Sequence, residues 1–310
     1  MRPLLAGRGA PRLVGLILGA ALATLGLSGT AFASHAAPGT KAWGYEAAVG
    51  SARILQYDIG TDTLDTTCVP PGSNNGRGIE QDASGNLFYT FVSSDGLFNG
   101  DGLIHHTTLP PACLPLPAIP FGDGPGGTVE DEIGAMDVDP DTGDIWAAGY
   151  KPDGSNNIRF YRVNPLTGAI ISQCKFPFQG GGVGNDTLAV TKSLSLGGSG
   201  KYLLTDGGEL LTTLFVFDAA DCTGDATPVP LTTYSLPEGV TGTDFVSEGG
   251  TLIASTISTI DSLGGPPFGS VVASMSSQSA VEDLTLKAPQ VSGGHPPKCR
   301  PPHRHHGCRR

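Results

Sequence analysis

The chain has 310 residues, of which 39% are hydrophobic and only 15% are charged, and its 18 Lys and Arg residues against 29 Asp and Glu residues give a formal net charge of -11. This composition allows a sizeable core and excludes a charged disordered protein or a long coiled coil. The acidic balance also argues against nucleic-acid binding, because such a surface repels phosphate backbones.

Residues 1–33 have the pattern of a secretory signal peptide. Three arginines precede an apolar stretch at 13–27, and residues 31–33 (Ala-Phe-Ala) have the form of a cleavage site. The stretch is shorter than the roughly 20 residues of a membrane span, and no later segment approaches that length. We therefore expect a secreted, extracellular protein, monomeric and without a membrane span in its mature form.

Short apolar segments then alternate with turns rich in Gly, Asn, Asp and Pro. Four hairpin patterns can be superimposed, each with an apolar strand, a polar turn that ends in glycine, and a second apolar strand. Their turn glycines recur at intervals of about 50 to 60 residues. These are Gly85, Gly143, Gly200 and Gly250. Further strands follow each hairpin, most clearly at 54–59 and 158–163, which lead through turns to strands ending near Cys68 and Cys174.

A four-stranded unit repeated at this interval is typical of β-propeller blades, whose faces are buried only against one another. The sequence predicts an all-β fold, a β-propeller of four-stranded blades, with five blades counted and six possible. An irregular β-sandwich is the alternative. The blades fall near 41–70, 77–122, 130–178, 186–237 and 240–288.

The first blade shows no obvious inner strand. Either residues 34–44 supply it, or the ring closes by pairing the terminal strands. The predicted organisation is a signal peptide at 1–33, a propeller domain at 34–288 and a disordered tail at 289–310, rich in Pro, His and Arg and containing two cysteines.

Several turns resemble those of a broad group of extracellular propellers that includes NHL-type, gluconolactonase-like and streptogramin-lyase-like proteins. The matching segments are Asp82-Ala-Ser-Gly85-Asn-Leu-Phe, Asp139-Pro-Asp-Thr-Gly143-Asp-Ile-Trp and Tyr161-Arg-Val-Asn-Pro-Leu-Thr-Gly168. The resemblance extends over about residues 41–288. Its motifs are generic propeller turns, which support the fold and select no member of the group.

Loops that lead into the innermost strands of a propeller converge at one mouth of the central channel. Here they contribute carboxylate and amide oxygens, which are ligands suited to Ca²⁺ or another divalent metal. The candidate ligands are Asn75, Glu132, Asp186 and Glu238. Resemblance to gluconolactonase-like propellers implies a central divalent metal held by similar residues. Solvated polar loops without a metal are the other interpretation.

The segment from Asp137 to Asp144 resembles a calcium-binding EF-hand loop only in part. Its glycine is one place late, no Glu stands at the twelfth position, and Pro140 constrains the turn. We expect a hairpin turn that needs no ion.

Catalysis by a nucleophile normally needs a nearby base, most often histidine. His105 and His106 lie on a predicted third strand, where adjacent side chains point to opposite faces. A streptogramin-lyase-like mechanism would require histidine at the channel mouth, and none is predicted there. Hydrolysis by a carboxylate pair is possible, although no spacing selects it.

The six cysteines are typical of an oxidising compartment, and their pairing cannot be deduced from sequence. The short spacing of Cys299 and Cys308 makes them a candidate pair. The same tail contains His303, His305 and His306, which are candidate metal ligands. Adhesion of the basic tail to an anionic polymer or to the acidic body, or an inert tail, are the alternatives.

The sequence thus favours a secreted β-propeller that acts as a binding or interaction module for an unknown extracellular or cell-wall ligand. One alternative is a metal-dependent hydrolase or lactonase with its site at the channel mouth. Another is a structural envelope protein.

Overall fold

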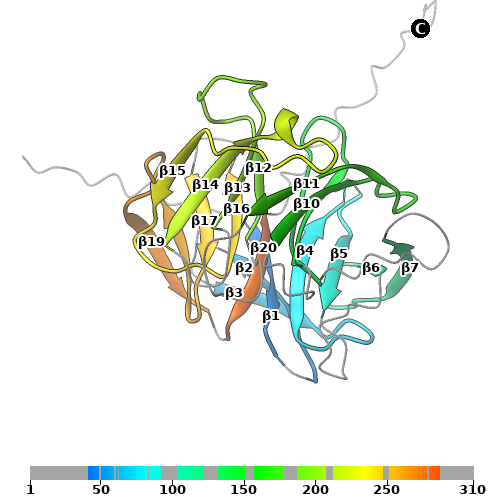
Figure 1. Ribbon diagram of the computed structural model, residues 1–310. Helices are drawn as coiled ribbons and strands as arrows, with labels where there is room; N and C mark the ends of the chain where they lie inside the picture. The colour runs from blue at the N-terminus through cyan, green and yellow to red at the C-terminus, as the bar shows by residue number, and fades with distance from the viewer. Residues whose placement is uncertain are drawn as a thin grey trace, which may run out of the picture. The chain divides into compact units, whose positions relative to one another are not determined.

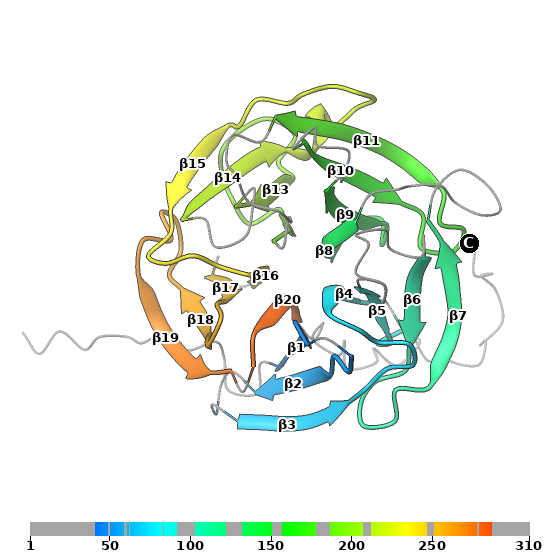
Figure 2. The same cartoon turned by 60° about the horizontal axis from the view of Figure 1, so that its bottom comes forward.

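The computed structural model describes residues 41–48, 50–58, 61, 63–82, 84–91, 103–121, 132–150, 157–177, 187–206, 212–246, 251–277 and 279–286. The chain divides into Met1–Phe32 and Ala33–Arg310, and the described residues all belong to the second unit. Within them, twenty strands form five antiparallel four-stranded sheets. The sheets are arranged as the blades of a propeller (Figure 1, Figure 2), which confirms the predicted fold and the count of five.

In each blade the four strands run in order from the axis to the perimeter. Blade 1 contains β20 (Val281–Leu286), β1 (Lys41–Glu46), β2 (Ile54–Asp58) and β3 (Thr63–Cys68). Blade 2 contains β4 (Gly76–Gln81), β5 (Leu87–Phe91), β6 (Leu103–Thr107) and β7 (Pro115–Pro120). Blade 3 contains β8 (Glu132–Val138), β9 (Ile145–Tyr150), β10 (Asn157–Val163) and β11 (Ile170–Pro177).

Blade 4 contains β12 (Ala189–Thr191), β13 (Tyr202–Thr205), β14 (Thr213–Asp218) and β15 (Thr232–Ser235), with the short 3-10 helix η1 (Ala219–Asp221) after β14. Blade 5 contains β16 (Gly242–Val246), β17 (Thr251–Ser255), β18 (Thr259–Leu263) and β19 (Val271–Ser276). Among the described residues, no helix has the length and hydrophobicity required to cross a membrane.

Pairing of the two ends of the propeller closes the ring. β20 is the last strand in sequence, yet it pairs antiparallel with β1, with Ala42 opposite Leu286 and Gly44 opposite Leu284. Blade 1 is therefore assembled from both ends of the domain. Of the two sequence-based explanations for its missing inner strand, pairing of the terminal strands is the correct one.

The loops divide between two faces of the ring. The crossover face carries the connections from one blade to the next and the turns between second and third strands. The hairpin face carries the turns between first and second and between third and fourth strands. The outermost strands run around the perimeter, so that each reaches toward the following blade (Figure 2).

The core consists of five apolar clusters, each shared by two neighbouring blades. Between blades 1 and 2, for example, Trp43 and Tyr45 pack with Ile79 and Tyr89. Because each blade presents an apolar face to both neighbours, no blade would be stable alone. This arrangement explains the run of alternating apolar residues in nearly every strand.

Glycine allows the innermost strands to approach closely. A Cβ atom at Gly242 would lie 2.6 Å from Cα of Asp283, and one at Gly78 would lie 3.0 Å from Cγ of Met136. Any larger residue at Gly242 would push β16 away from β20. The taper of the blades therefore depends on these small residues.

Carboxylates on the innermost strands join the blades near the axis. Asp283 is fully buried on β20, and its Oδ2 accepts N–H groups from Ile79 at 3.0 Å and Met136 at 3.1 Å, on β4 and β8. Asp137 on β8 accepts the N–H of Val190 on β12. Backbone groups that face the axis are thereby satisfied without a neighbouring strand.

Two disulfides link neighbouring blades at the perimeter. Cys68 at the end of β3 pairs with Cys113 in the β6–β7 turn, with Cα atoms 6.0 Å apart. Cys174 on β11 pairs with Cys222 after η1, with Cα atoms 4.9 Å apart. The bonds join blade 1 to blade 2 and blade 3 to blade 4. Cys299 and Cys308 lie outside the described residues, so their pairing stays a prediction.

Replacement of Asp283 should destabilise the ring strongly. Asp283→Ala removes the acceptor for two buried N–H groups, each of which costs about 1–3 kcal/mol when unsatisfied. We expect the free energy of unfolding, measured with urea, to fall by about 2–6 kcal/mol. Asp225→Asn is the control, because its side chain is 70% exposed and its loss should cost under about 1 kcal/mol. Equal losses for both variants would contradict the role of Asp283.

Candidate functional site

The four predicted metal ligands of the channel mouth are not equally visible in the structure. Asn75 precedes β4, with φ of 28°, and its N–H donates to the carbonyl of Ala48 at 2.9 Å. Glu132 is the first residue of β8, and only its backbone pairing with Tyr150 is described. Asp186 lies outside the described residues, as do His303, His305 and His306 of the tail. The metal site stays a prediction.

Glu238, the fourth predicted ligand, lies in the crossover between β15 and β16. Its carboxyl group hydrogen-bonds to Asp261 on β18, the third strand of blade 5. Asp261 is buried, and its Oδ2 also accepts a hydrogen bond from the Thr259 hydroxyl at 2.7 Å. The hydrogen bond with Asp261, together with burial and Coulomb repulsion, raises the pKa of Glu238 to about 7. The pair therefore shares a proton near neutral pH.

The described side chains do not assemble a metal centre. Among the residues that the structure describes, no three His, Cys, Asp or Glu side chains are grouped closely enough to bind an ion together.

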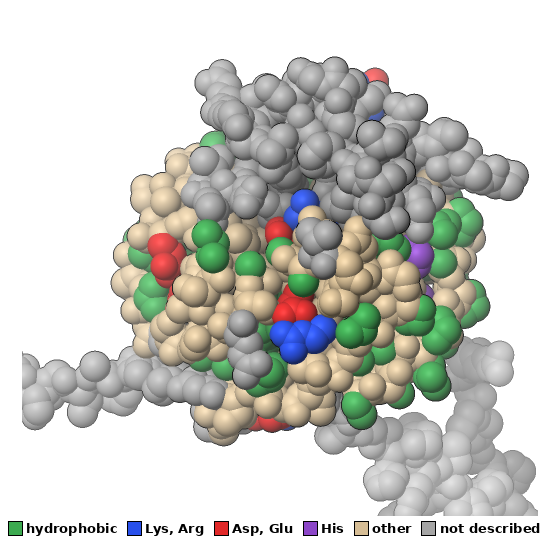
Figure 3. Space-filling view, turned by 90° about the horizontal axis from the view of Figure 1, so that it is seen from below, with side chains coloured by type: hydrophobic (Ala, Val, Ile, Leu, Met, Phe, Trp, Pro, Cys, Tyr) green, Lys and Arg blue, Asp and Glu red, His purple; other side chains and the backbone are tan. Residues whose placement is uncertain are grey.

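The visible side chains of the crossover face include few charged groups, and acidic and basic groups meet near its middle (Figure 3). One such pairing on this face joins Arg53 to Glu46 at 2.5 Å.

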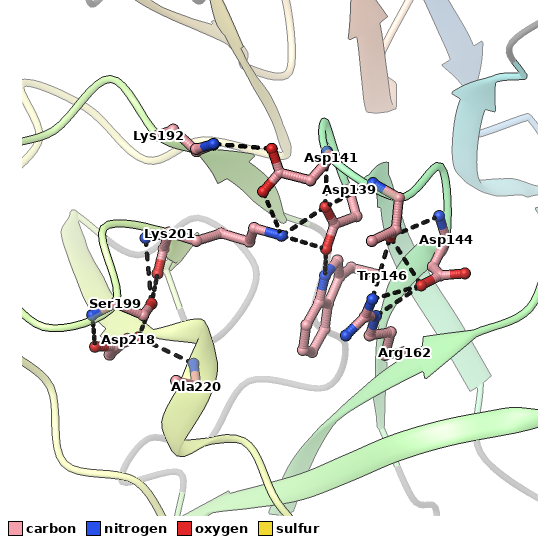
Figure 4. Close-up of polar contacts among 11 residues, drawn as sticks. Asp139, Asp141, Asp144, Trp146, Arg162, Lys192, Ser199, Lys201, Asp218 and Ala220 are labelled. Carbon is pink, nitrogen blue, oxygen red and sulfur yellow. Dashed lines mark hydrogen bonds and ion pairs between the residues drawn. The ribbon is translucent and has the colours of Figure 1, made fainter. Parts of the chain in front are cut away.

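An ion-pair network joins blades 3 and 4 on the hairpin face (Figure 4). Lys201, from the β12–β13 turn, extends to the β8–β9 turn, where its Nζ donates to Asp139 at 2.6 and 2.7 Å and contacts Asp141 at 3.0 Å. The Asp139 side chain is 1% exposed and also accepts the indole N–H of Trp146 at 3.4 Å. Lys192 pairs with Asp141 at 2.8 Å.

Charge and burial act against each other in this network. Burial alone would raise the pKa of Asp139, but hydrogen bonds from Lys201 and the backbone of Asp141 outweigh it and lower the pKa. Burial would lower the pKa of Lys201, and its hydrogen bonds to both aspartates raise it instead. The ammonium group thus neutralises the turn that resembles a calcium loop. Asp139 also accepts the backbone N–H of Asp141 at 2.9 Å, which confirms a hairpin turn at this position.

Among the residues that the structure describes, no such pair joins the equivalent turns of blades 2 and 3. Asp82 directly follows the first strand of blade 2, as Asp139 follows the first strand of blade 3. Asp144 follows the turn glycine of blade 3, as Lys201 follows that of blade 4. Two carboxylates cannot attract each other. Each instead has a partner within its own blade: Asp82 contacts His106 at 2.9 Å, and Asp144 contacts Arg162 at 2.6 Å.

A groove of about 460 Å³ lies at this junction. Its lining is mostly apolar, with proline and leucine at the rim and a histidine and an aspartate among the polar members. The lining residues are Asp82, Ser84, Asn86, Phe88, His106, Pro117, Ala118, Ile119, Pro120, Val138, Gly143, Pro165 and Leu166. Leu166 is 89% exposed in the β10–β11 turn. Neither disulfide among the described residues crosses this junction.

The two histidines of β6 have different surroundings, as their positions on a strand predict. His106 stacks on Phe88 with ring centroids 4.5 Å apart, and its Nε2 contacts Oδ2 of Asp82. His105 stacks on Tyr89 and Phe91, at 5.2 and 4.7 Å, toward blade 1. His106 therefore lines the groove. Its partner Asp82 is held in place because its Oδ1 accepts the backbone N–H groups of Ser84 and Asn86.

This groove is not evident from the sequence. The turn containing Asp82 and the proline-rich strand β7 were visible, but the strand that faces them belongs to the next blade. One feature of the sequence is related to it: the residue after the turn glycine is Asp144 in blade 3 and Lys201 in blade 4. This difference becomes meaningful only once the order of the blades around the ring is known.

No protein-family model and no curated protein matches the chain. Among solved structures, it is similar to a protein of unknown function from Bacteroides caccae, at 11% identity and a TM-score of 0.45 over 80% of this chain and 98% of that one. It is also similar to a chain in a nidogen/laminin complex, at 11% identity and a TM-score of 0.44 over 81% and 99% of the two chains. A protein from Lactobacillus plantarum is similar at 13% identity and a TM-score of 0.41, over 76% of this chain and 66% of that one. Likeness at this level assigns no function.

Loss of Lys201 should destabilise the protein in a pH-dependent way. Lys201→Met leaves the buried Asp139 without its cation, and we expect a loss of about 2–4 kcal/mol at pH 7 in urea unfolding. Because the folded-state pKa of Asp139 is lowered, the stabilisation by the pair is present above the ordinary pKa. It disappears as the pH falls through the lowered value.

The control for this variant is Lys192→Met. Lys192 is 53% exposed, so its loss should cost less than about 1 kcal/mol. A loss for Lys201→Met that stays constant down to pH 2 would contradict the assignment.

The Glu238 and Asp261 pair should make stability depend on pH near neutrality. The raised pKa of Glu238 means that its ionisation is opposed in the folded state, so stability falls as the pH rises from about 4.5 through 7. Glu238→Gln removes this titration and should become progressively more stable than the parent chain between pH 5 and pH 8. Parallel curves of unfolding free energy against pH for the two proteins would refute the shared proton.

Proposed function

We propose that the protein is a secreted binding module whose ligand site is the groove between blades 2 and 3. The apolar, partly exposed groove carries this proposal. Secretion is supported by the signal-peptide pattern of residues 1–33 and by disulfides, which persist in oxidising compartments.

The lining of the groove favours an extended apolar segment of an extracellular partner. Pro117 and Pro120 are exposed and present flat apolar surfaces, and Leu166 projects into solvent at the rim. Proline-rich and leucine-containing segments dock on surfaces of this kind, because they lose little conformational entropy when they bind. Contiguous exposed apolar surface with polar residues beside it is a common mark of an interaction site.

Charge at the same junction favours a ligand with a basic side chain. Between blades 3 and 4, Lys201 lies between two turns and neutralises Asp139. Between blades 2 and 3, the corresponding positions carry Asp82 and Asp144, which contact His106 and Arg162 of their own blades. A ligand Arg or Lys near Asp82 would add a cation between the two turns, with the strength of a charge-assisted hydrogen bond.

The test uses the full chain and the fluorescein-labelled peptide Pro-Leu-Pro-Pro-Leu-Arg, with binding followed by fluorescence anisotropy. Leu166→Ser should weaken binding about tenfold, because one leucine contact is lost. Val229→Ser is the matched control, since Val229 is 77% exposed in the β14–β15 segment, away from the groove. Equal effects of the two variants, or no saturable binding by the parent chain, would overturn the proposal.

The basic side chain is tested separately. Asp82→Asn keeps an oxygen that can accept the turn N–H groups, but it removes the charge. This variant should bind the Arg peptide more weakly and lose the parent chain's preference for it over the same peptide ending in Gln. An undiminished preference would exclude Asp82 as the partner of the cation.

A further inference from the structure

The last strand of the propeller ends on the same face as the groove. Leu286 of β20 is paired with Ala42 near the start of β1. The adjacent Lys41 forms ion pairs with Asp58 and Asp65, which flank the β2–β3 turn of the hairpin face. The described part of the chain therefore ends on the hairpin face, and residues 287–310 follow it in sequence.

The chemistry of this terminal segment matches the groove. Residues 287–310 contain no acidic residue, and their side chains include repeated proline pairs and six basic groups. The prolines are Pro289, Pro296, Pro297, Pro301 and Pro302, and the basic residues are Lys287, Lys298, Arg300, Arg304, Arg309 and Arg310. A segment of this length spans up to about 80 Å when extended, which is ample for reaching the adjacent blades.

Two features of the groove select such a segment. Its apolar lining includes Pro117, Pro165 and Leu166, which suit an extended proline-containing chain. Asp82, which contacts His106, provides a carboxylate among them. Among the described residues, no Lys or Arg bridges the turns of this junction as Lys201 does one blade further on.

We propose that residues 289–310 dock in the groove between blades 2 and 3 of their own chain. The proline pairs lie against the apolar lining, and a basic side chain from the intervening residues 298–300 or 303–304 approaches Asp82. The proposal rests on the proposed function, because it makes the tail an intramolecular competitor for the same site. An external ligand would then have to displace the tail.

Because the tail belongs to the same chain as the groove, even weak contacts between them are sufficient for docking. The tail is tethered on the face that it binds, so its effective concentration at the groove is in the millimolar range for a flexible linker of this kind. A free ligand at micromolar concentration competes at a disadvantage unless it binds more tightly. Salt should weaken docking of the tail, since it screens the attraction between the basic residues and Asp82.

The direct test is photocrosslinking within the full chain. A benzoylphenylalanine placed at Leu166 should form crosslinks to peptides from residues 289–310 in monomeric protein, independently of protein concentration. The same group at Val229, which is also exposed, should give few such crosslinks. Equal tail crosslinking from both positions, or none from 166, would overturn the proposal. Crosslinked dimers that increase with concentration would assign the groove to the tail of a second copy instead.

A competition experiment separates this proposal from the proposed function. The variant Lys298→Glu, Arg300→Glu, Arg304→Glu reverses charges in the tail and leaves the propeller unchanged. It should bind the Pro-Leu-Pro-Pro-Leu-Arg peptide about fivefold or more tightly than the parent chain, because tethered competition is weakened. Equal, Leu166-dependent binding by both chains would refute tail docking and keep the binding groove. No peptide binding by either chain would refute the binding groove as the ligand site, while crosslinking from position 166 still decides whether the tail lies there.

Discussion

The carboxylate of Asp283 accepts backbone N–H groups from the innermost strands of two other blades, and the rest of the ring depends on this contact and on the pairing of its own strand with β1. Innermost strands have no neighbour on the axial side, so their inward amides need another acceptor. A fully buried carboxylate supplies it with charge-assisted bonds. Because β20 comes from the end of the domain, these bonds form only when almost the whole chain has folded.

Around this axis, the five junctions between blades are chemically different although their cores are alike. The junctions of blades 1 and 2 and of blades 3 and 4 carry disulfides, and the latter also carries the Lys201 network. The junction of blades 2 and 3 has carboxylates at both corresponding turn positions, each with a partner in its own blade. The groove lies at this junction, and mostly apolar side chains line it.

This difference connects stability with binding. Where a cation lies between two turns, the junction is closed and contributes to stability. Where no described cation bridges the two turns, the junction retains a groove, and we propose that a basic and apolar segment binds there. Binding sites commonly form where a fold leaves its own interactions unfinished, since ligand contacts then replace those that the chain does not make. The rigid propeller holds the two sides of the groove in position.

The sequence by itself determined the repeat, the all-β propeller and the position of the third-strand histidines, because strand alternation and turn glycines are local properties of the chain. It could not decide between two ways of closing blade 1, nor pair Cys68 with Cys113, because both depend on which segments become neighbours. The channel-mouth ligands Asn75, Glu132, Asp186 and Glu238 stay a prediction. The link from Glu238 to Asp261, the bridge from Lys201 to Asp139 and the groove beside His106 were decided by tertiary structure alone, since each joins residues from separate strands or blades.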